Sequence, residues 1–310
     1  MHKNSLTYPL FIFTISIILA GCVMSNAIGE DKPEQEIRPP SVAGTFYPAS
    51  ASQLRKEITT LLNNIPERLT EDEIFSAIAP HAGYVYSGEV AAHTFKQLSN
   101  VEFDTIVIIG HDYPYLDAVA FTCPVDYFQT PLGKVPVDKE MIEKMHAFNR
   151  GIKANRSIHS DDHSIEVQLP FIQVLGKNCR IVPILFGNPT PKKCQILADA
   201  IIASAGDKRV FVLASSDMSH RLPYESANII DKSTLEVLKT MDIKRLFKSD
   251  LQTALCARGG VGTAILFSKA HEGDHAQVLH YANSGDAPIG SKQSVVGYSS
   301  VLFLKTAGND

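Results

Sequence analysis

The sequence predicts a single α/β domain in which a mostly parallel sheet carries helices on both faces. Two observations predict this fold class. Short apolar runs of strand length alternate along the chain with segments whose apolar residues recur at helical spacing, and this alternation is typical of strands connected through helices. No repeat, low-complexity tract or linker divides the roughly 270 residues that follow the N-terminal region. One domain therefore accounts for them.

The first half of this domain begins with a helix, because Leu54, Ile58, Leu61 and Ile65 recur at a helical period. The apolar runs that follow predict buried strands, most clearly TIVIIG at 105–110. In chain order we expect a helix at 54–65, a strand at 75–80, a helix at 89–98, strands at 105–110 and 118–123, a strand and turn near 130–133, and a helix at 138–149 opened by an acidic cap.

The second half continues the alternation. Pro170 falls inside a periodic segment, where it predicts a kink or a boundary. The last two apolar runs follow one another without a helix between them, so we expect them to pair antiparallel. In chain order the expected elements are a helix at 164–175, a strand at 180–187, a helix at 192–205, a strand at 209–216, helices at 226–241 and 262–270, and strands at 276–282 and 294–304.

The N-terminal region is not expected to belong to the fold. Lys3 precedes an apolar core at 10–19, which has the length of a signal peptide and is short for a membrane span. Leu19-Ala20-Gly21-Cys22 resembles the lipobox of bacterial lipoproteins, in which the signal is cut before the cysteine and lipid is attached to it. We expect Cys22 to anchor the protein to a membrane of the bacterial cell envelope; an ordinary secretory signal is the alternative. The predicted organisation is a lipoprotein signal peptide at 1–21, a flexible tether at 22–37 and the domain at 38–306.

Composition limits the classes of partner and the kinds of cross-link expected for the protein. The formal net charge is −4 and no basic stripe is present, so a nucleic-acid partner is not expected. A hydrophobic content of 45% with 20% charged residues fits a compact fold. The four cysteines after Cys22 form no CxxC pair, which argues against a structural zinc site. An exported location permits disulfides, and Cys179 with Cys194 is the nearest pair, but no sequence feature establishes that bond.

Chemically capable side chains follow several predicted strands. His81 follows the strand at 75–80, in the run Ala79-Pro80-His81-Ala82-Gly83, and His111 follows the strand at 105–110. Asp217 and His220 come after 209–216, and the loop at 160–164 adds His163. A lone histidine beside a turn is more often solvated or capping. Because parallel strands end at one edge of the sheet, where α/β proteins bind ligands, four such ends together favour a common site.

Several of these residues also have other interpretations. Asp217 and His220 would share a helix face if a helix began there, with Asp217 as its cap or as a site residue. Asp162-His163-Ser164 contains the residue types of a serine triad, but the chain has no GxSxG elbow, so that assignment is weak. Cys256 stands before a glycine-rich turn and is either a small buried hydrophobe or an exposed thiolate, which is a soft metal ligand.

Five runs in fixed order resemble the Memo family, specifically the bacterial members called AmmeMemoRadiSam system protein B. The runs are RPPSVAGTFYP at 38–48, PHAGYVYSG at 80–88, TPLG at 130–133, HSIEVQLPF at 163–171 and SSDMSH at 215–220. The family is similar in fold to the class III extradiol dioxygenases, and its members bind iron or copper. The resemblance implies that His81 and Cys256 are metal ligands. It also implies that His163, Asp217 and His220 line the same pocket.

The chain departs from the family at one position. The family pattern after the second strand is Gly-Pro-Asn/Ser-His, whose histidine is the remaining ligand. Here the residues are Gly110-His111-Asp112-Tyr113, which puts Tyr113 where the histidine belongs. His111 reaches the metal from two positions earlier, or Tyr113 or Asp112 replaces it, or the site is degraded. We favour His111, because positions 111 and 113 share a side if the strand runs on.

Two classes of function follow from these residues. The first is a metal-dependent oxidoreductase that holds iron, or else copper or zinc, and acts on an unknown substrate, with His163, Asp217 and His220 moving protons. A thiolate in place of a carboxylate ligand makes ring-cleaving dioxygenase chemistry doubtful. The second is a non-enzymatic module that binds a metal, small molecule, peptide or protein in the same cleft. A zinc hydrolase ranks last, because the chain has no HExxH signature.

Overall fold

The structure is a computed structural model that describes residues 34–67, 70–248 and 254–308. Residues 35–310 form one compact unit. The predicted signal peptide and the lipidation site at Cys22 lie outside the described residues. In the part of the chain that is described, no helix combines the length and the apolar character needed to cross a bilayer.

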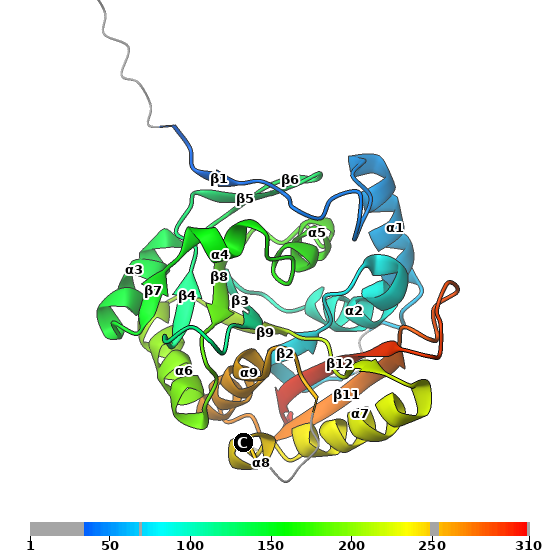
Figure 1. Ribbon diagram of the computed structural model, residues 1–310. Helices are drawn as coiled ribbons and strands as arrows, with labels where there is room; N and C mark the ends of the chain where they lie inside the picture. The colour runs from blue at the N-terminus through cyan, green and yellow to red at the C-terminus, as the bar shows by residue number, and fades with distance from the viewer. Residues whose placement is uncertain (1–33, 68–69, 249–253, 309–310) are drawn as a thin grey trace, which may run out of the picture. The chain divides into compact units, whose positions relative to one another are not determined.

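Within the described residues the main sheet has nine strands, and its centre is parallel; Figure 1 shows the arrangement. Its four central strands lie in the order β2-β9-β3-β8, and each neighbouring pair is parallel. Antiparallel β12 extends one edge, and antiparallel β4 extends the other. The strands are β2 (Glu73–Ala79), β3 (Thr105–Asp112), β4 (Ala120–Thr122), β7 (Ile152–Ala154), β8 (Arg180–Phe186), β9 (Val210–Ser215), β10 (His220–Leu222), β11 (His275–Asn283) and β12 (Val295–Lys305).

The predicted α/β class is confirmed, with a mixed sheet whose antiparallel strands lie toward its edges. The last two strands, β11 and β12, pair antiparallel as expected. A second sheet of three strands holds β1 (Ile37–Arg38) beside the hairpin of β5 (Tyr127–Thr130) and β6 (Gly133–Pro136). This hairpin contains the strand and turn predicted near 130–133.

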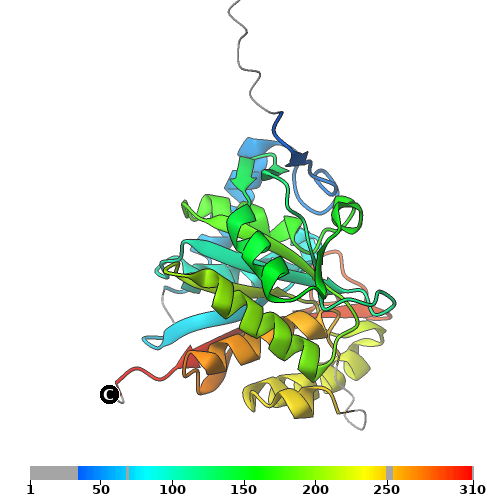
Figure 2. The same cartoon turned by 90° about the vertical axis from the view of Figure 1, so that its left-hand side faces the viewer.

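Helices cover both faces of the main sheet (Figures 1 and 2). Helix α9 packs on β9, β2 and β3 with α6 beside it, and α2 packs on β12, β11 and β2 together with α1 and α5. Ser76 of β2 points toward α9, and its hydroxyl donates to the Ala264 carbonyl; Ser300, on the opposite face, contacts Thr94 of α2. The helices are α1 (Ala51–Asn63), α2 (Tyr84–Leu98), α3 (Lys139–Phe148), α4 (Arg156–Ser160), the 3-10 turn η1 (Glu166–Gln168), α5 (Leu169–Val174), α6 (Pro191–Ala205), α7 (Tyr224–Lys239), α8 (Ile243–Leu246) and α9 (Arg258–Ala270).

The structure decides two local expectations, one at Pro170 and one at residues 217–220. Pro170 marks a boundary, because it lies in the first turn of α5 just after η1, where a missing N–H costs nothing. The helix considered for 217–220 is absent, so the idea that Asp217 and His220 share a helix face is wrong. That segment pairs with β12 instead: Met218 N donates to the Gly297 carbonyl at 2.8 Å, and Gly297 N donates to the Ser219 carbonyl at 2.8 Å.

Candidate metal centre

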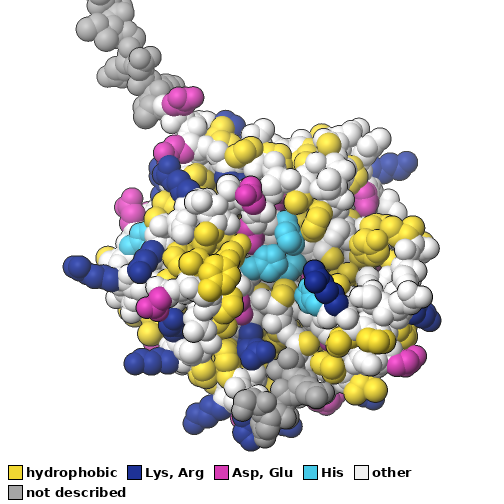
Figure 3. All heavy atoms as spheres, viewed as in Figure 1, with side chains coloured by type: hydrophobic (Ala, Val, Ile, Leu, Met, Phe, Trp, Pro, Cys, Tyr) yellow, Lys and Arg dark blue, Asp and Glu magenta, His cyan; other side chains and the backbone are white. Residues whose placement is uncertain are grey.

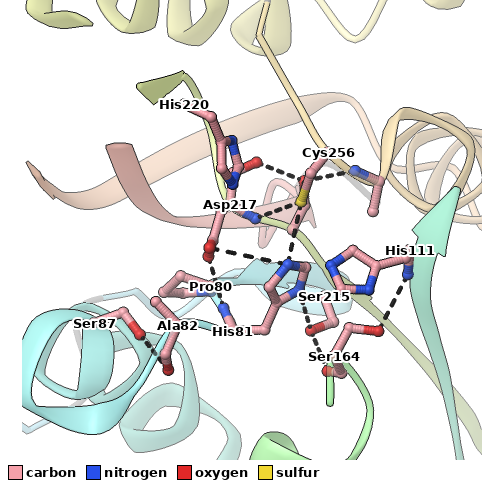
Figure 4. Close-up of polar contacts among 12 residues, drawn as sticks. Pro80, His81, Ala82, Ser87, His111, Ser164, Ser215, Asp217, His220 and Cys256 are labelled. Atoms are coloured by element: carbon pink, nitrogen blue, oxygen red, sulfur yellow. Dashed lines mark hydrogen bonds and ion pairs between the residues drawn. The ribbon is translucent and has the colours of Figure 1, made fainter. Parts of the chain in front are cut away.

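The ends of β2 and β3 and the segment before α9 bring His81, His111 and Cys256 together (Figure 4). One ligand atom from each residue lies within 4.8 Å of the other two. Cys256 Sγ is 3.2 Å from His81 Nε2, and the two imidazole centroids are 4.4 Å apart. Bonds of about 2.0–2.3 Å from one metal place its ligand atoms roughly 3–4.5 Å from each other. The three side chains could therefore hold one metal ion.

Hydrogen bonding fixes the tautomer of His81. The residue follows β2, and its backbone N donates to Asp217 Oδ1 at 2.8 Å. Its Nδ1 lies 3.1 Å from Ser215 Oγ, and the single hydroxyl hydrogen of Ser215 is already donated to the Ser164 carbonyl at 2.6 Å. Nδ1 must therefore carry the ring hydrogen and donate to Ser215. This leaves a lone pair on Nε2, the atom that faces Cys256.

The Asp162 carboxylate orients the His111 ring, as Ser215 orients the His81 ring. Its Nδ1 lies 2.8 Å from Asp162 Oδ2. Burial works to raise the pKa of Asp162, but the hydrogen bonds and charge of His111, with the Ser164 hydroxyl, hold that pKa well below its usual range. An ionised carboxylate can only accept, so His111 Nδ1 donates. Burial lowers the pKa of His111, but the hydrogen bond and charge of Asp162 raise it overall, so a metal ion that binds Nε2 competes with a proton there. A carboxylate behind a histidine is the usual support of a metal ligand.

The structure also places the two alternatives to His111. The Asp112 carboxylate turns toward α9 and accepts from Gly259 N at 3.1 Å. The Tyr113 hydroxyl donates to Asp162 Oδ2 at 3.2 Å. Of these three neighbours, only His111 joins the cluster with His81 and Cys256. Its binding of a metal stays a prediction.

Cys256 lies just before the N-terminus of α9. Its Sγ accepts from Asp217 N at 3.2 Å, and its own N–H donates to the Asp217 carbonyl at 3.2 Å. Burial, then the nearby Asp217 carboxyl, raises the pKa of the thiol well above its usual value. Metal binding would therefore release a proton, as it does for thiol ligands generally. The other described cysteines are free and buried: Cys123, Cys179 and Cys194.

The three predicted proton-transfer residues surround this cluster. Asp217 is buried, its Oδ2 lies 3.9 Å from His81 Nε2, and burial raises its pKa to about 7. The His163 ring centroid is 4.9 Å from that of His111 and 5.5 Å from that of His81. His220 lies beside Asp217 and Cys256, with Nδ1 2.9 Å from the Met218 carbonyl (Figure 4). Histidine side chains gather at the centre of the face in Figure 3.

Sequence reasoning missed the residues that support the ligands. Ser215 is fully buried and receives a hydrogen bond from Gln168 Nε2 at 2.7 Å. Ser164, also fully buried, donates to Asp162 Oδ1 at 2.6 Å and accepts from His111 N at 3.1 Å. No histidine ring activates the Ser164 hydroxyl in these contacts, so they do not form a serine triad. The only advance signal was that Ser215, Ser164 and Gln168 lie inside the matched motifs.

Comparison with known proteins identifies the family of the chain. A family model described as Memo-like protein matches residues 38–302. A MEMO1 family protein of Saccharolobus solfataricus is 36% identical over 283 residues, which is 86% of this chain and 99% of that protein. MEMO1 family proteins of Methanobrevibacter smithii and Archaeoglobus fulgidus are 35% and 34% identical, each over 86% of this chain and 99% of their own length. The chain therefore belongs to the Memo family.

Proposed function

We propose that the protein is a metal-dependent oxidoreductase of the bacterial cell envelope. It holds one redox-active ion, iron in first place and copper in second, through His81 Nε2, His111 Nε2 and Cys256 Sγ. Lipid on Cys22 holds the protein at the membrane. Its substrate is a small molecule that reaches the histidine cluster from solvent.

One observation carries this proposal: both imidazoles turn Nε2 toward the same thiol. The hydrogen bonds to Ser215 and Asp162 occupy the two Nδ1 atoms, so Nε2 is the nitrogen that each ring offers to a metal. Two imidazoles and one thiolate suit iron, copper and zinc. Three protein ligands leave coordination positions open, as a catalytic metal requires.

The surrounding residues give this centre its chemistry. A bound redox ion supplies electron transfer and polarises a substrate oxygen. The chain itself supplies groups that hold and move protons: the Asp217 carboxyl on the His81 side, His220 near Cys256, and His163 across from His111. Imidazoles suit this task near neutral pH.

Anaerobic reconstitution with ferrous iron, followed by elemental analysis, tests the centre. We expect about one ion per chain in the wild type and a loss of most of it in His81→Ala and Cys256→Ala. His280→Ala is a matched control, because this imidazole stacks on His93 away from the cluster, with centroids 4.5 Å apart. Equal metal content in the wild type and His81→Ala would reject the centre.

An assay of oxygen consumption distinguishes an enzyme from a binding module. The iron-loaded protein is expected to consume oxygen with an added catechol or thiol, and His163→Ala and His220→Ala are expected to slow consumption without loss of iron. Tight iron retention with no turnover on any substrate would instead favour metal storage or partner binding.

A separate experiment tests the membrane anchor. Cys22→Ala should move the protein from the membrane fraction to the soluble fraction of cells. Continued membrane association would reject lipidation at Cys22.

A further inference from the structure

Arg221 follows His220 in β10 and interrupts the pairing of β10 with β12. The register of this pair shifts between His220 and Leu222. The φ angle of Arg221 is +59°, in the left-handed region that residues other than glycine, asparagine and aspartate rarely adopt. Bulges re-aim side chains and are common beside functional sites.

The fold keeps this strained residue in place. On one side of it, Gly297 N donates to the Ser219 carbonyl at 2.8 Å; on the other, Tyr224 N donates to the Lys292 carbonyl at 3.0 Å. Both bonds tie the strand to its neighbour, so Arg221 cannot relax alone. A glycine would meet the same φ without strain. The sequence carries arginine here against its backbone preference, which points to a role for the side chain.

Arg221 is exposed and is the chain neighbour of His220. Burial is the main cause that lowers the pKa of His220, and the charges of His111 and Arg221 lower it further. The guanidinium is therefore within electrostatic range of the His220 ring, which stands beside Cys256 and Asp217 (Figure 4).

Among residues 34–67, 70–248 and 254–308, none forms a hydrogen bond or ion pair with the side chain of Arg221. The carboxylates around the cluster already have other donors: Asp217 accepts from His81 N, Asp162 accepts from His111, and Asp231 accepts from Ser219 and Tyr281. The guanidinium of this exposed residue therefore keeps its five N–H donors available for a ligand.

We propose that Arg221 binds a carboxylate group of the substrate and so makes the centre selective for small organic anions. This inference rests on the proposed function. A planar guanidinium matches a carboxylate with two parallel hydrogen bonds. The Cys256 thiolate and the ionised Asp162 carboxylate would offset the charge of a bound divalent ion. Arg221 therefore supplies the positive charge that attracts an anion entering from solvent.

Calorimetric titration with benzoate and with its neutral analogue benzamide tests the proposal. We expect the iron-loaded wild type to bind benzoate about tenfold more tightly than benzamide, and Arg221→Gln to lose this preference. Arg221→Lys should retain part of it. Arg55→Gln removes the same charge from an exposed position of α1 and should bind benzoate like the wild type.

Arg221→Gly separates ligand binding from structure. Glycine relieves the positive φ, so this variant should unfold at the same temperature as the wild type or a higher one while losing the preference for benzoate. An unchanged preference in Arg221→Gln, or no preference in the wild type, would overturn the proposal. Titrating metal-free protein keeps the two proposals apart: benzoate selectivity that depends on Arg221, in a protein that takes up no iron, would support Arg221 and reject the metal centre.

Discussion

Ser215 has one hydroxyl hydrogen, and the use of that hydrogen decides how His81 meets a metal. The Ser164 carbonyl receives it, so His81 Nδ1 must donate to Ser215 and Nε2 is left free. In Ser215→Ala the ring loses this partner, and either tautomer or a rotated ring becomes accessible. We expect the affinity for ferrous iron to fall by a factor of roughly 10–100, measured by competition with a chromophoric chelator.

Ser268→Ala is the matched control for this prediction. Ser268 is also a fully buried serine, and the described residues provide no hydrogen-bond partner for its Oγ. The control should bind iron like the wild type. Wild-type affinity in Ser215→Ala would show that the tautomer of His81 does not depend on this hydroxyl.

The departure at Gly110-His111-Asp112-Tyr113 gives a second prediction. Because Tyr113 donates to Asp162 while His111 turns Nε2 toward Cys256, His111→Ala should abolish iron binding and Tyr113→Phe should weaken it less than tenfold. Elemental analysis and the same competition assay measure both variants. Iron loss in Tyr113→Phe with full retention in His111→Ala would make the tyrosine the ligand.

Members of the cluster were predictable as candidate ligands where a residue type with a narrow chemical range follows a strand. His81 and His111 meet that condition, and Cys256 became a candidate ligand through the family resemblance. Ser215 and Gln168 could not be assigned roles, because serine and glutamine are common in buried structure and their function here depends on which way a proton points. That direction is set by contacts between distant segments, such as Ser215 with Ser164.

At the scale of elements, the end of β3 explains why glycine precedes His111. A Cβ on Gly110 would lie 2.0 Å from Ser164 Oγ and 3.1 Å from Leu185 Cδ2. Gly110→Ala must therefore displace Ser164, which donates to Asp162 and thereby supports His111. We expect the free energy of unfolding, measured with urea, to fall by about 2 kcal/mol, with a weaker iron affinity in the same variant.

Gly83→Ala is the control for Gly110→Ala. Its Cβ would lie 3.5 Å from the Phe46 carbonyl oxygen, an ordinary contact distance, and the φ angle of Gly83 is −57°. This variant should change stability by less than about 0.5 kcal/mol. If Gly110→Ala is as stable as Gly83→Ala, a Cβ at position 110 does not displace Ser164, and the prediction is wrong.

Elements built on long periodic or apolar runs were predictable, and short elements that depend on a partner strand were not. β3, β8 and β9 are apolar along most of their length because helices cover both faces of the sheet. The segment from Asp217 to Leu222 has no such pattern. It becomes β10 through its pairing with β12, which lies more than seventy residues later in the chain.

Over the whole molecule, one buried carboxylate fastens the start of the folded unit to the loop that supports His111. Glu166 is fully buried and accepts from Ser41 N at 2.7 Å, from Val42 N at 3.1 Å, and from Tyr47 and Arg38. Arg38 also donates to the His159 and Asp162 carbonyls. The sequence placed Glu166 in the predicted helix at 164–175. It could not show that residues 38–47 fold back onto this segment.

This arrangement predicts how stability depends on pH. Burial alone would raise the pKa of Glu166, but the hydrogen bonds from Ser41, Tyr47 and Arg38 outweigh burial and lower it. A carboxyl whose pKa is lower in the folded state stabilises the fold above the unfolded pKa, near 4.3, and loses that contribution as pH falls through the folded value. Stability of the wild type should therefore decline below about pH 5 partly through Glu166.

Glu166→Gln isolates this contribution. At pH 7 the variant leaves the Arg38 guanidinium buried without its carboxylate, so we expect a loss of about 3 kcal/mol in the free energy of unfolding measured with urea. Below about pH 5 its stability should fall less steeply than that of the wild type, and the two curves should approach each other. Glu102→Gln removes a carboxylate that is 69% exposed and paired with Lys177, and should follow the wild-type curve. If the free energy of unfolding falls with the same slope below pH 5 in Glu166→Gln and in the wild type, protonation of Glu166 does not cause the acid destabilisation.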